Sequence, residues 1–94
     1  MDFEQFEWDE EKNLYNKRVH KISFESAAAV FDDDNRLDFY DGKHSLFEDR
    51  YKTIGAINGY ITIVTVIYTK RKRVTRIISA RKANKKEREE YYDR

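Results

Sequence analysis

The chain contains no cysteine and no proline, and only three of its 94 residues are glycine. Without cysteine it can form no disulfide, no thiolate nucleophile and no cysteine-ligated zinc site. No linker rich in Gly, Ser or Pro divides the sequence, and no glycine-rich loop is available to bind phosphate. We therefore expect a single domain over residues 1–94.

Long apolar runs are also missing. The longest apolar stretch, Tyr60 to Tyr68, is far shorter than the ~20 residues that a membrane helix needs. The first segment, Met1 to Glu11, is acidic, whereas a signal peptide begins with basic residues. These two observations predict a cytoplasmic protein with no targeting segment and no membrane partner.

No metal-binding pattern is present. The acidic run that begins at Asp32 suggests a calcium loop, but Leu37 and Lys43 stand where an EF-hand needs Gly and Glu. The sequence has no H-x-x-x-H pair. We expect neither a metal nor a cofactor.

Charge is abundant but unevenly distributed. Residues 1–49 carry 6 Lys or Arg against 14 Asp or Glu, whereas residues 50–94 carry 13 against 4. A basic half of this size is typical of proteins that bind a polyanion. The alternative is that the two halves neutralise each other within the folded protein.

Helix signals occur at three places. Asp9 is placed to cap a helix ending near Arg18 or Val19, with Leu14, Tyr15, Arg18 and Val19 on one face. Ser23 is placed to cap a second helix, whose apolar stripe Phe24, Ala27, Ala28 and Phe31 is suited to cover a sheet. This helix should end at the turn-forming run 32–35. Asn84 and Glu87 form a capping box before a polar helix that reaches the C-terminus.

Strand signals fill the rest. A short strand-like segment contains Phe3, Phe6 and Trp8, and a half-buried strand is expected over 37–40. Residues 41–49 form a polar loop. Asn58-Gly59 predicts a hairpin between strands 50–56 and 60–69, and a basic turn over 70–73 leads to a return strand over 74–80. The order predicts an α+β domain with an antiparallel sheet whose two N-terminal helices and one C-terminal helix cover one face.

Residues in both halves of the chain resemble the BrnT family of toxins. The first half carries Phe6-Glu7-Trp8-Asp9, Lys12-Asn13, His20-Lys21-Ile22-Ser23-Phe24-Glu25, Ala27 and Val30-Phe31-Asp32. The second half carries His44, Asp49-Arg50, Gly55, Tyr68-Thr69-Lys70-Arg71, Arg76-Ile77-Ile78-Ser79-Ala80-Arg81-Lys82-Ala83, Glu87-Arg88 and Tyr91.

The resemblance implies a RelE-like fold, a ribonuclease toxin of a type II toxin–antitoxin system, inhibition of translation and growth arrest. It also implies a BrnA-like antitoxin of the ribbon-helix-helix type as partner. Operator DNA would be bound only through the complex with that antitoxin.

RNA can be cleaved without a metal when its own 2′-hydroxyl attacks the adjacent phosphorus. Arginine suits such a site because a guanidinium offers paired donors to phosphate oxygens. We hypothesise that Arg71 and Arg81 bind the scissile phosphate and that Arg50 assists them. The residues expected to hold or steer the RNA are Lys12, Arg76, Lys82 and Lys86. Each of these side chains has the alternative of being a plain surface cation.

Two features of this arrangement stay open. Arg76 and Arg81 are separated by an odd number of residues, so a regular strand would point them to opposite faces unless a β-bulge intervenes. Tyr51 and Tyr68 lie beside cations and could stack on bases, but aromatics at strand spacing are more often core residues.

His44 is the first candidate for proton transfer, because imidazole titrates near neutral pH. His20 is a second candidate, although it follows a helix and is more often a cap for the last carbonyls. Glu48 and Asp49 could serve as a base or could only orient Arg50. As a whole the chain is predicted to be an endoribonuclease. The alternative is a non-catalytic module that binds nucleic acid or an acidic partner.

Overall fold

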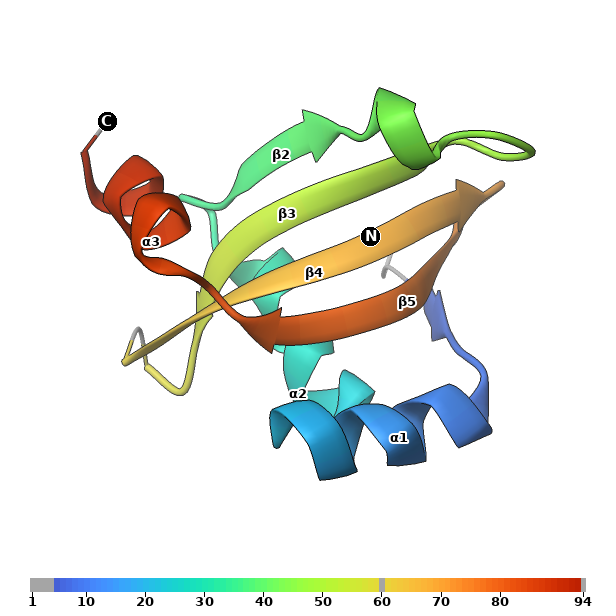
Figure 1. The fold of residues 1–94 in the computed structure, drawn as a ribbon, viewed down its shortest axis with the longest axis horizontal. Coiled ribbons are helices and arrows are strands. Elements are labelled where there is room, and N and C mark those ends of the chain that lie inside the picture. The colour runs from blue at the N-terminus through green and yellow to red at the C-terminus, as the bar shows by residue number, and fades with distance from the viewer. Residues whose placement is uncertain (1–4, 60, 94) are drawn as a thin grey trace.

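Within residues 5–59 and 61–93, which the computed structural model describes, five strands form one sheet in the order β1-β5-β4-β3-β2 (Figure 1). The strands are β1 (Gln5–Glu7), β2 (Leu37–Tyr40), β3 (Arg50–Ile57), β4 (Thr62–Arg71) and β5 (Val74–Lys82). Strand β1 pairs in parallel with β5 and every other pair is antiparallel, so the predicted all-antiparallel sheet is wrong at this edge. Residue patterns report strands but not the direction in which two strands far apart in sequence will pair. Phe3 and Tyr60, which were predicted in strands, lie outside the described residues.

The helices begin where their capping residues predicted. They are α1 (Glu10–His20), α2 (Phe24–Ala27), which continues as the 3₁₀ helix η1 (Ala28–Asp32), the short η2 (Gly42–His44), and α3 (Lys85–Tyr92). Asp9 accepts from the Glu11 N–H, Ser23 from the Ser26 N–H, and Asn84 shares a capping box with Glu87. No helix within 5–59 and 61–93 is long and apolar enough to cross a membrane.

Helices lie on both faces of the sheet, which corrects the prediction that all three cover one face. The main core lies between α2, η1 and one face of the sheet, where Phe24, Val30, Val66 and Ile77 are buried. A smaller cluster lies on the opposite face, where Tyr91 of α3 packs with side chains of β3 and β4. Helix α3 covers only one end of this second face (Figure 1), and the rest is called the open face below.

Helix α1 turns its polar side to the sheet. Leu14, Tyr15 and Val19 are 57%, 55% and 46% exposed, and Asn13 and Asn16 are buried instead. The Asn16 amide donates to the Ala80 carbonyl (2.7 Å) and accepts from the Ala80 N–H (3.2 Å). These bonds satisfy backbone groups of β5, whose outer edge β1 pairs only over residues 74–76. An amide therefore replaces an apolar side chain because the sheet edge needs hydrogen-bond partners.

A β-bulge in the last hairpin determines which face of the sheet Arg76 and Arg81 occupy. Ile77 pairs with Tyr68 and Ser79 with Ile67, so one residue of β5 is extra. The bulge places Arg76, opposite Thr69, and Arg81, opposite Thr65, on the same open face. Tyr68 is buried and Tyr51 packs against the main core, which favours the core interpretation of both tyrosines.

The remaining strand predictions had mixed outcomes. Strand β4 is central in the sheet, and Asn58 and Gly59 both have positive φ (53° and 67°) in the predicted hairpin between β3 and β4. The predicted half-buried strand is wrong for β2. As the edge strand it leaves Phe39 and Tyr40 exposed, and only Leu37 is partly covered.

The acidic run after η1 has a structural role at Asp33. This buried carboxylate accepts from the Ala56 N–H (2.8 Å), the Asn35 N–H (2.9 Å) and the Tyr91 hydroxyl. It therefore ties η1, β3 and α3 together and anchors the otherwise polar helix α3.

Candidate functional site

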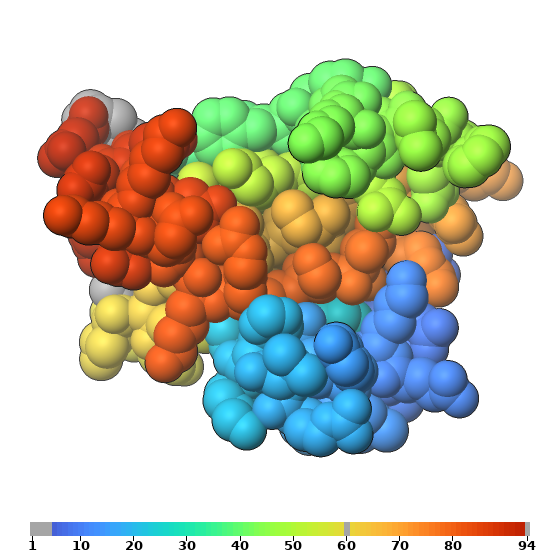
Figure 2. Space-filling model, viewed as in Figure 1, coloured from blue at the N-terminus to red at the C-terminus, as the bar shows by residue number. Residues whose placement is uncertain are grey.

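The open face forms a hollow between η2 and α3. Its volume is about 380 Å³ and its lining residues are Phe39, Tyr40, Asp41, His44, Lys52, Ile67 and Arg81. Side chains of β3, β4 and β5 reach the surface there, between α3 and the segment of residues 41–49 (Figure 2). Strand pairing explains why they gather, because Lys52 lies opposite Ile67 and Arg81 opposite Thr65 on neighbouring strands.

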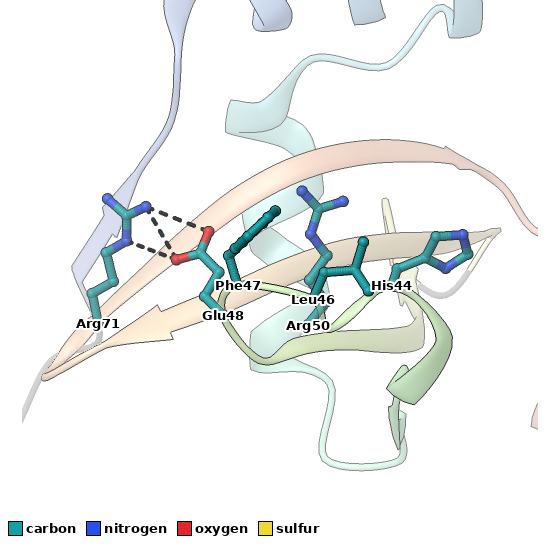
Figure 3. A pocket seen from close by; sticks show the side chains of 6 residues that line it. All are labelled: His44, Leu46, Phe47, Glu48, Arg50 and Arg71. Carbon is teal, nitrogen blue, oxygen red and sulfur yellow. Dashed lines mark hydrogen bonds and ion pairs between the residues drawn. The ribbon is translucent and has the colours of Figure 1, made fainter.

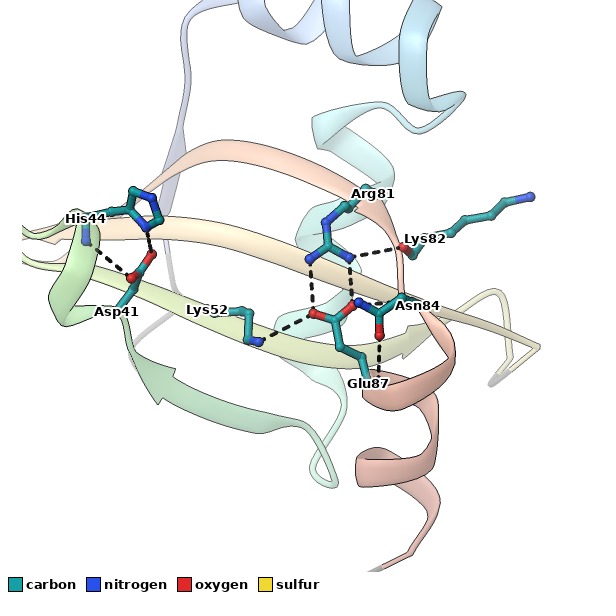
Figure 4. A network of polar contacts seen from close by, with 7 residues as sticks. All are labelled: Asp41, His44, Lys52, Arg81, Lys82, Asn84 and Glu87. Carbon is teal, nitrogen blue, oxygen red and sulfur yellow. Dashed lines mark hydrogen bonds and ion pairs between the residues drawn. The ribbon is translucent and has the colours of Figure 1, made fainter.

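The best-defined feature of this hollow is a carboxylate that holds two cations (Figure 4). Glu87 of α3 accepts two hydrogen bonds from Arg81, at 2.7 Å from Nη1 and 3.0 Å from Nη2. The Lys52 ammonium lies 3.4 Å from the same carboxylate and 5.1 Å from the centre of the Phe39 ring. A paired arginine presented in a fixed orientation is well suited to bind a phosphate.

Glu87 is itself fixed by the start of α3. The Asn84 N–H donates to its carboxylate (2.9 Å) and the Asn84 side chain accepts from the Glu87 N–H (2.8 Å). Burial raises the pKa of Glu87, but the bonds from Arg81 and Asn84 and the Arg81 charge outweigh it, and the pKa falls to about 2. The side chain is 5% exposed, whereas those of Arg81 and Lys52 are 40% and 32% exposed. One buried negative charge thus orients two cations that still reach solvent.

A histidine–aspartate pair stands at the other end of the hollow. His44 Nδ1 lies 2.8 Å from Asp41 Oδ2, and the Asp41 side chain also accepts from the His44 N–H at the start of η2. Burial raises the pKa of Asp41, but hydrogen bonds from the His44 side chain and backbone and the charges of His44 and Arg50 lower it overall. The imidazole is 60% exposed, so its Nε2 is accessible for proton transfer.

A second hollow of about 530 Å³ begins on the other side of His44. It is lined by His44, Leu46, Phe47, Glu48, Arg50 and Arg71 (Figure 3). Arg71 donates to both carboxylate oxygens of Glu48, at 3.1 to 3.4 Å. The predicted residues His44, Arg50 and Arg71 therefore do come together here.

Arg71 and Arg81, predicted to bind one phosphate, are not brought together. Arg81 pairs with Thr65, six residues along β4 from Arg71, which corresponds to about 20 Å of strand. Glu48 and Asp49 also have contacts away from Arg50: Glu48 pairs with Arg71, and Asp49 accepts from the Tyr40 hydroxyl.

The predicted RNA-holding cations are scattered. Arg76 lies on the open face but pairs with Glu7 (3.6 Å) at the β1 edge. Lys82, at the end of β5, points away from the Glu87 network in Figure 4, and Lys86 is exposed on α3. Lys12 is exposed on α1, the helix that packs against β5. His20 ends α1, but Lys21, with its left-handed φ of 63°, provides the backbone cap.

Sequence reasoning missed Lys52 and Asp41, and it gave Glu87 only a capping role. The signal for Lys52 was present, because Arg50 and Lys52 have the two-residue spacing that places side chains on one face of a strand. Across the described ranges 5–59 and 61–93, no group of three or more His, Cys, Asp or Glu side chains is arranged to hold a metal.

Comparison with known proteins identifies a family for this chain. Residues 8–87 match the family described as "Ribonuclease toxin, BrnT, of type II toxin-antitoxin system". No curated protein matches the chain. The family match spans nearly all of the fold, from Trp8, just after β1, to Glu87 in α3. The chain therefore belongs to the BrnT family of ribonuclease toxins of type II toxin–antitoxin systems.

Proposed function

We propose that the open face is the active site of a metal-independent endoribonuclease with a RelE-like arrangement. The observation that carries this proposal is the Glu87 carboxylate, which orients Arg81 and Lys52 toward the hollow that His44 also lines. A phosphate placed in this hollow meets two oriented cations and a group able to transfer a proton. Fixed positive charge directed at developing negative charge is commonly the largest catalytic contribution.

In the proposed reaction the 2′-oxygen of one nucleotide bonds to the adjacent phosphorus, and the bond from phosphorus to the 5′-oxygen breaks. The 2′-hydroxyl proton passes to water. Arg81 and Lys52 stabilise the charge on the non-bridging oxygens. The products are a 2′,3′-cyclic phosphate and a 5′-hydroxyl, so no metal-bound water is needed.

His44 supplies the proton for the departing 5′-oxygen. Asp41 holds Nδ1–H, which leaves Nε2 directed away from the pair to exchange the proton.

Arg50 and Arg71 extend the positive surface from His44 along the strand ends, where they would bind neighbouring phosphates. Arg76, Lys82, Lys86 and Lys12 lie outside the two hollows, and their contribution is steering of the RNA.

Membership of a type II toxin family implies an antitoxin partner. We infer a BrnA-like antitoxin of the ribbon-helix-helix type that covers the open face, with operator DNA bound only through the complex. Uninhibited RNA cleavage would inhibit translation and arrest growth. Recovery of the native complex from the host should yield a small protein encoded next to this one. A toxin recovered alone would contradict this part of the proposal.

The test of the activity is incubation of the purified protein with a defined single-stranded RNA in EDTA, followed by analysis of the product ends. The proposal predicts cleavage with cyclic phosphate and 5′-hydroxyl ends. Products with a 5′-phosphate, or cleavage only after a divalent metal is added, would contradict it. A non-catalytic binding module would leave the RNA intact and show only binding whose salt dependence follows the number of phosphates contacted.

A further inference from the structure

The tip of the loop between η2 and β3 is apolar and fully exposed. Leu46 is 80% exposed and Phe47 is 101% exposed. Single exposed apolar residues are common, but these two are adjacent and line the hollow of about 530 Å³ that also contains Arg50 and Arg71. A volume of this size is within the range of small-ligand sites.

The loop is held at both of its ends, so the ring is presented by a fixed segment. The Ser45 hydroxyl donates to the Asp41 carbonyl (2.6 Å) and accepts from the Arg50 N–H (2.8 Å). On the other side, Arg71 of β4 binds the Glu48 carboxylate. The two residues between Ser45 and Glu48 form the tip.

The chemistry of the hollow is that of a surface for single-stranded nucleic acid. In Figure 3 the Phe47 ring and the Arg50 guanidinium project to the same side, between the Arg71–Glu48 pair and His44. Proteins that bind single strands stack bases on aromatic rings while nearby cations follow the phosphates.

The hollow adjoins the proposed active site, because His44 lines both hollows. We propose that Phe47, supported by Leu46, stacks on the base of a nucleotide next to the cleaved phosphate while Arg50 and Arg71 bind its backbone. This subsite rests on the proposed ribonuclease function and adds to it a substrate class. The substrate is unpaired RNA with relaxed base identity, since every base has a face to stack but a paired base cannot be inserted.

The test uses a 2′-O-methyl RNA oligonucleotide that contains 2-aminopurine. It cannot be cleaved through a 2′-hydroxyl, and its fluorescence falls when the base stacks. The variants are Phe47→Ala, Phe47→Tyr, which keeps the ring, and Ile61→Ala as a matched control. Ile61 is 82% exposed in the hairpin at the opposite end of β3. Because both positions are exposed, thermal unfolding should be unchanged in all three.

Wild type, Phe47→Tyr and Ile61→Ala should bind and quench the probe, and the same sequence in a duplex should not. Phe47→Ala should lose the quenching and bind about 5- to 100-fold more weakly, with a matching rise in KM for cleavable RNA. Wild-type quenching and affinity in Phe47→Ala would overturn the subsite. The subsite is also overturned if Phe47→Ala binds the probe like wild type and loses affinity only for the antitoxin.

Two further outcomes separate the subsite from the function on which it rests. If wild type cleaves RNA but does not quench the probe, the subsite is wrong and the ribonuclease proposal stands. If wild type neither cleaves RNA nor binds the probe, both are wrong.

Discussion

Arg81 and Glu87 are joined by two parallel hydrogen bonds of 2.7 and 3.0 Å between the end of β5 and the first turn of α3. The same carboxylate contacts Lys52 from β3, so it connects three elements that are distant in sequence. Glu87 is thus a positioning residue for the cations of the proposed active site and also part of the docking of α3.

Replacing Glu87→Gln should separate these two roles. Glutamine can still take part in a capping box but cannot pair with two cations. We expect kcat to fall about 10-fold or more with little change in KM, and the free energy of unfolding to fall by about 2–3 kcal/mol. Single-turnover cleavage and urea unfolding measure the two effects. A variant with wild-type kcat but reduced stability would show that Glu87 is only structural.

Because the pKa of Glu87 is lower in the folded protein, the free energy of unfolding depends on pH in the acid range. Its pKa is about 2 in the folded protein, against 4.5 for an ordinary glutamate. The unfolded chain therefore takes up a proton first as pH falls, so this stabilisation is complete above pH 4.5 and is lost between pH 4.5 and about 2. The ionised Glu87 carboxylate thus contributes about 3 kcal/mol of stability. Urea unfolding at several pH values should show this loss in wild type and in the exposed-site control Glu89→Gln. Glu87→Gln should lack it, and an equal decline in all three proteins would contradict the assignment.

The Asn16 amide should matter more than the apolar side chains on the outside of α1. Asn16→Leu leaves the Ala80 N–H and C=O and the Ile22 C=O without their partner. It should cost about 2–4 kcal/mol of stability. The matched variant Leu14→Asn, on the exposed face, should change stability by about 0.5 kcal/mol or less. The same thermal or urea unfolding assay measures both, and a Leu14→Asn variant that is the less stable of the two would contradict the observed orientation of α1.

Gly55 lies where η1 crosses the sheet. A Cβ at this position would lie 2.7 Å from Val30 Cγ1 and 3.1 Å from Arg36 Cβ. Gly55→Ala should therefore destabilise the protein by about 1–3 kcal/mol. Adding Val30→Ala removes the closest atom, so the double variant should lose less than the sum of the two single changes. Strict additivity in a double-mutant cycle would show that the predicted contact is not made.

The features that sequence predicted well depend on near neighbours. Asp9, Ser23 and Asn84 were identified as helix caps because each bonds an N–H two or three residues away. The Asn58-Gly59 hairpin follows from the same kind of local preference.

The features that sequence missed depend on distant partners. The burial of Asn16 is explained only by Ala80, which is 64 residues away. Lys52 became a site residue only through Glu87, 35 residues further along the chain. The parallel pairing of β1 with β5 was likewise outside the reach of local patterns. Two residues of the proposed site, His44 and Arg81, were recognisable from residue type and family resemblance. Their positions relative to each other follow only from the fold.

The central claim is that the open face cleaves RNA through oriented cations, and single-turnover cleavage by Arg81→Ala in EDTA tests it most directly. The matched control is Arg18→Ala, an arginine on α1 that stacks over Tyr15 and has no part in the proposed site. The account predicts that Arg81→Ala cleaves about 100- to 1,000-fold more slowly while RNA binding weakens far less, and that Arg18→Ala cleaves like wild type. Equal cleavage by all three folded proteins would contradict it.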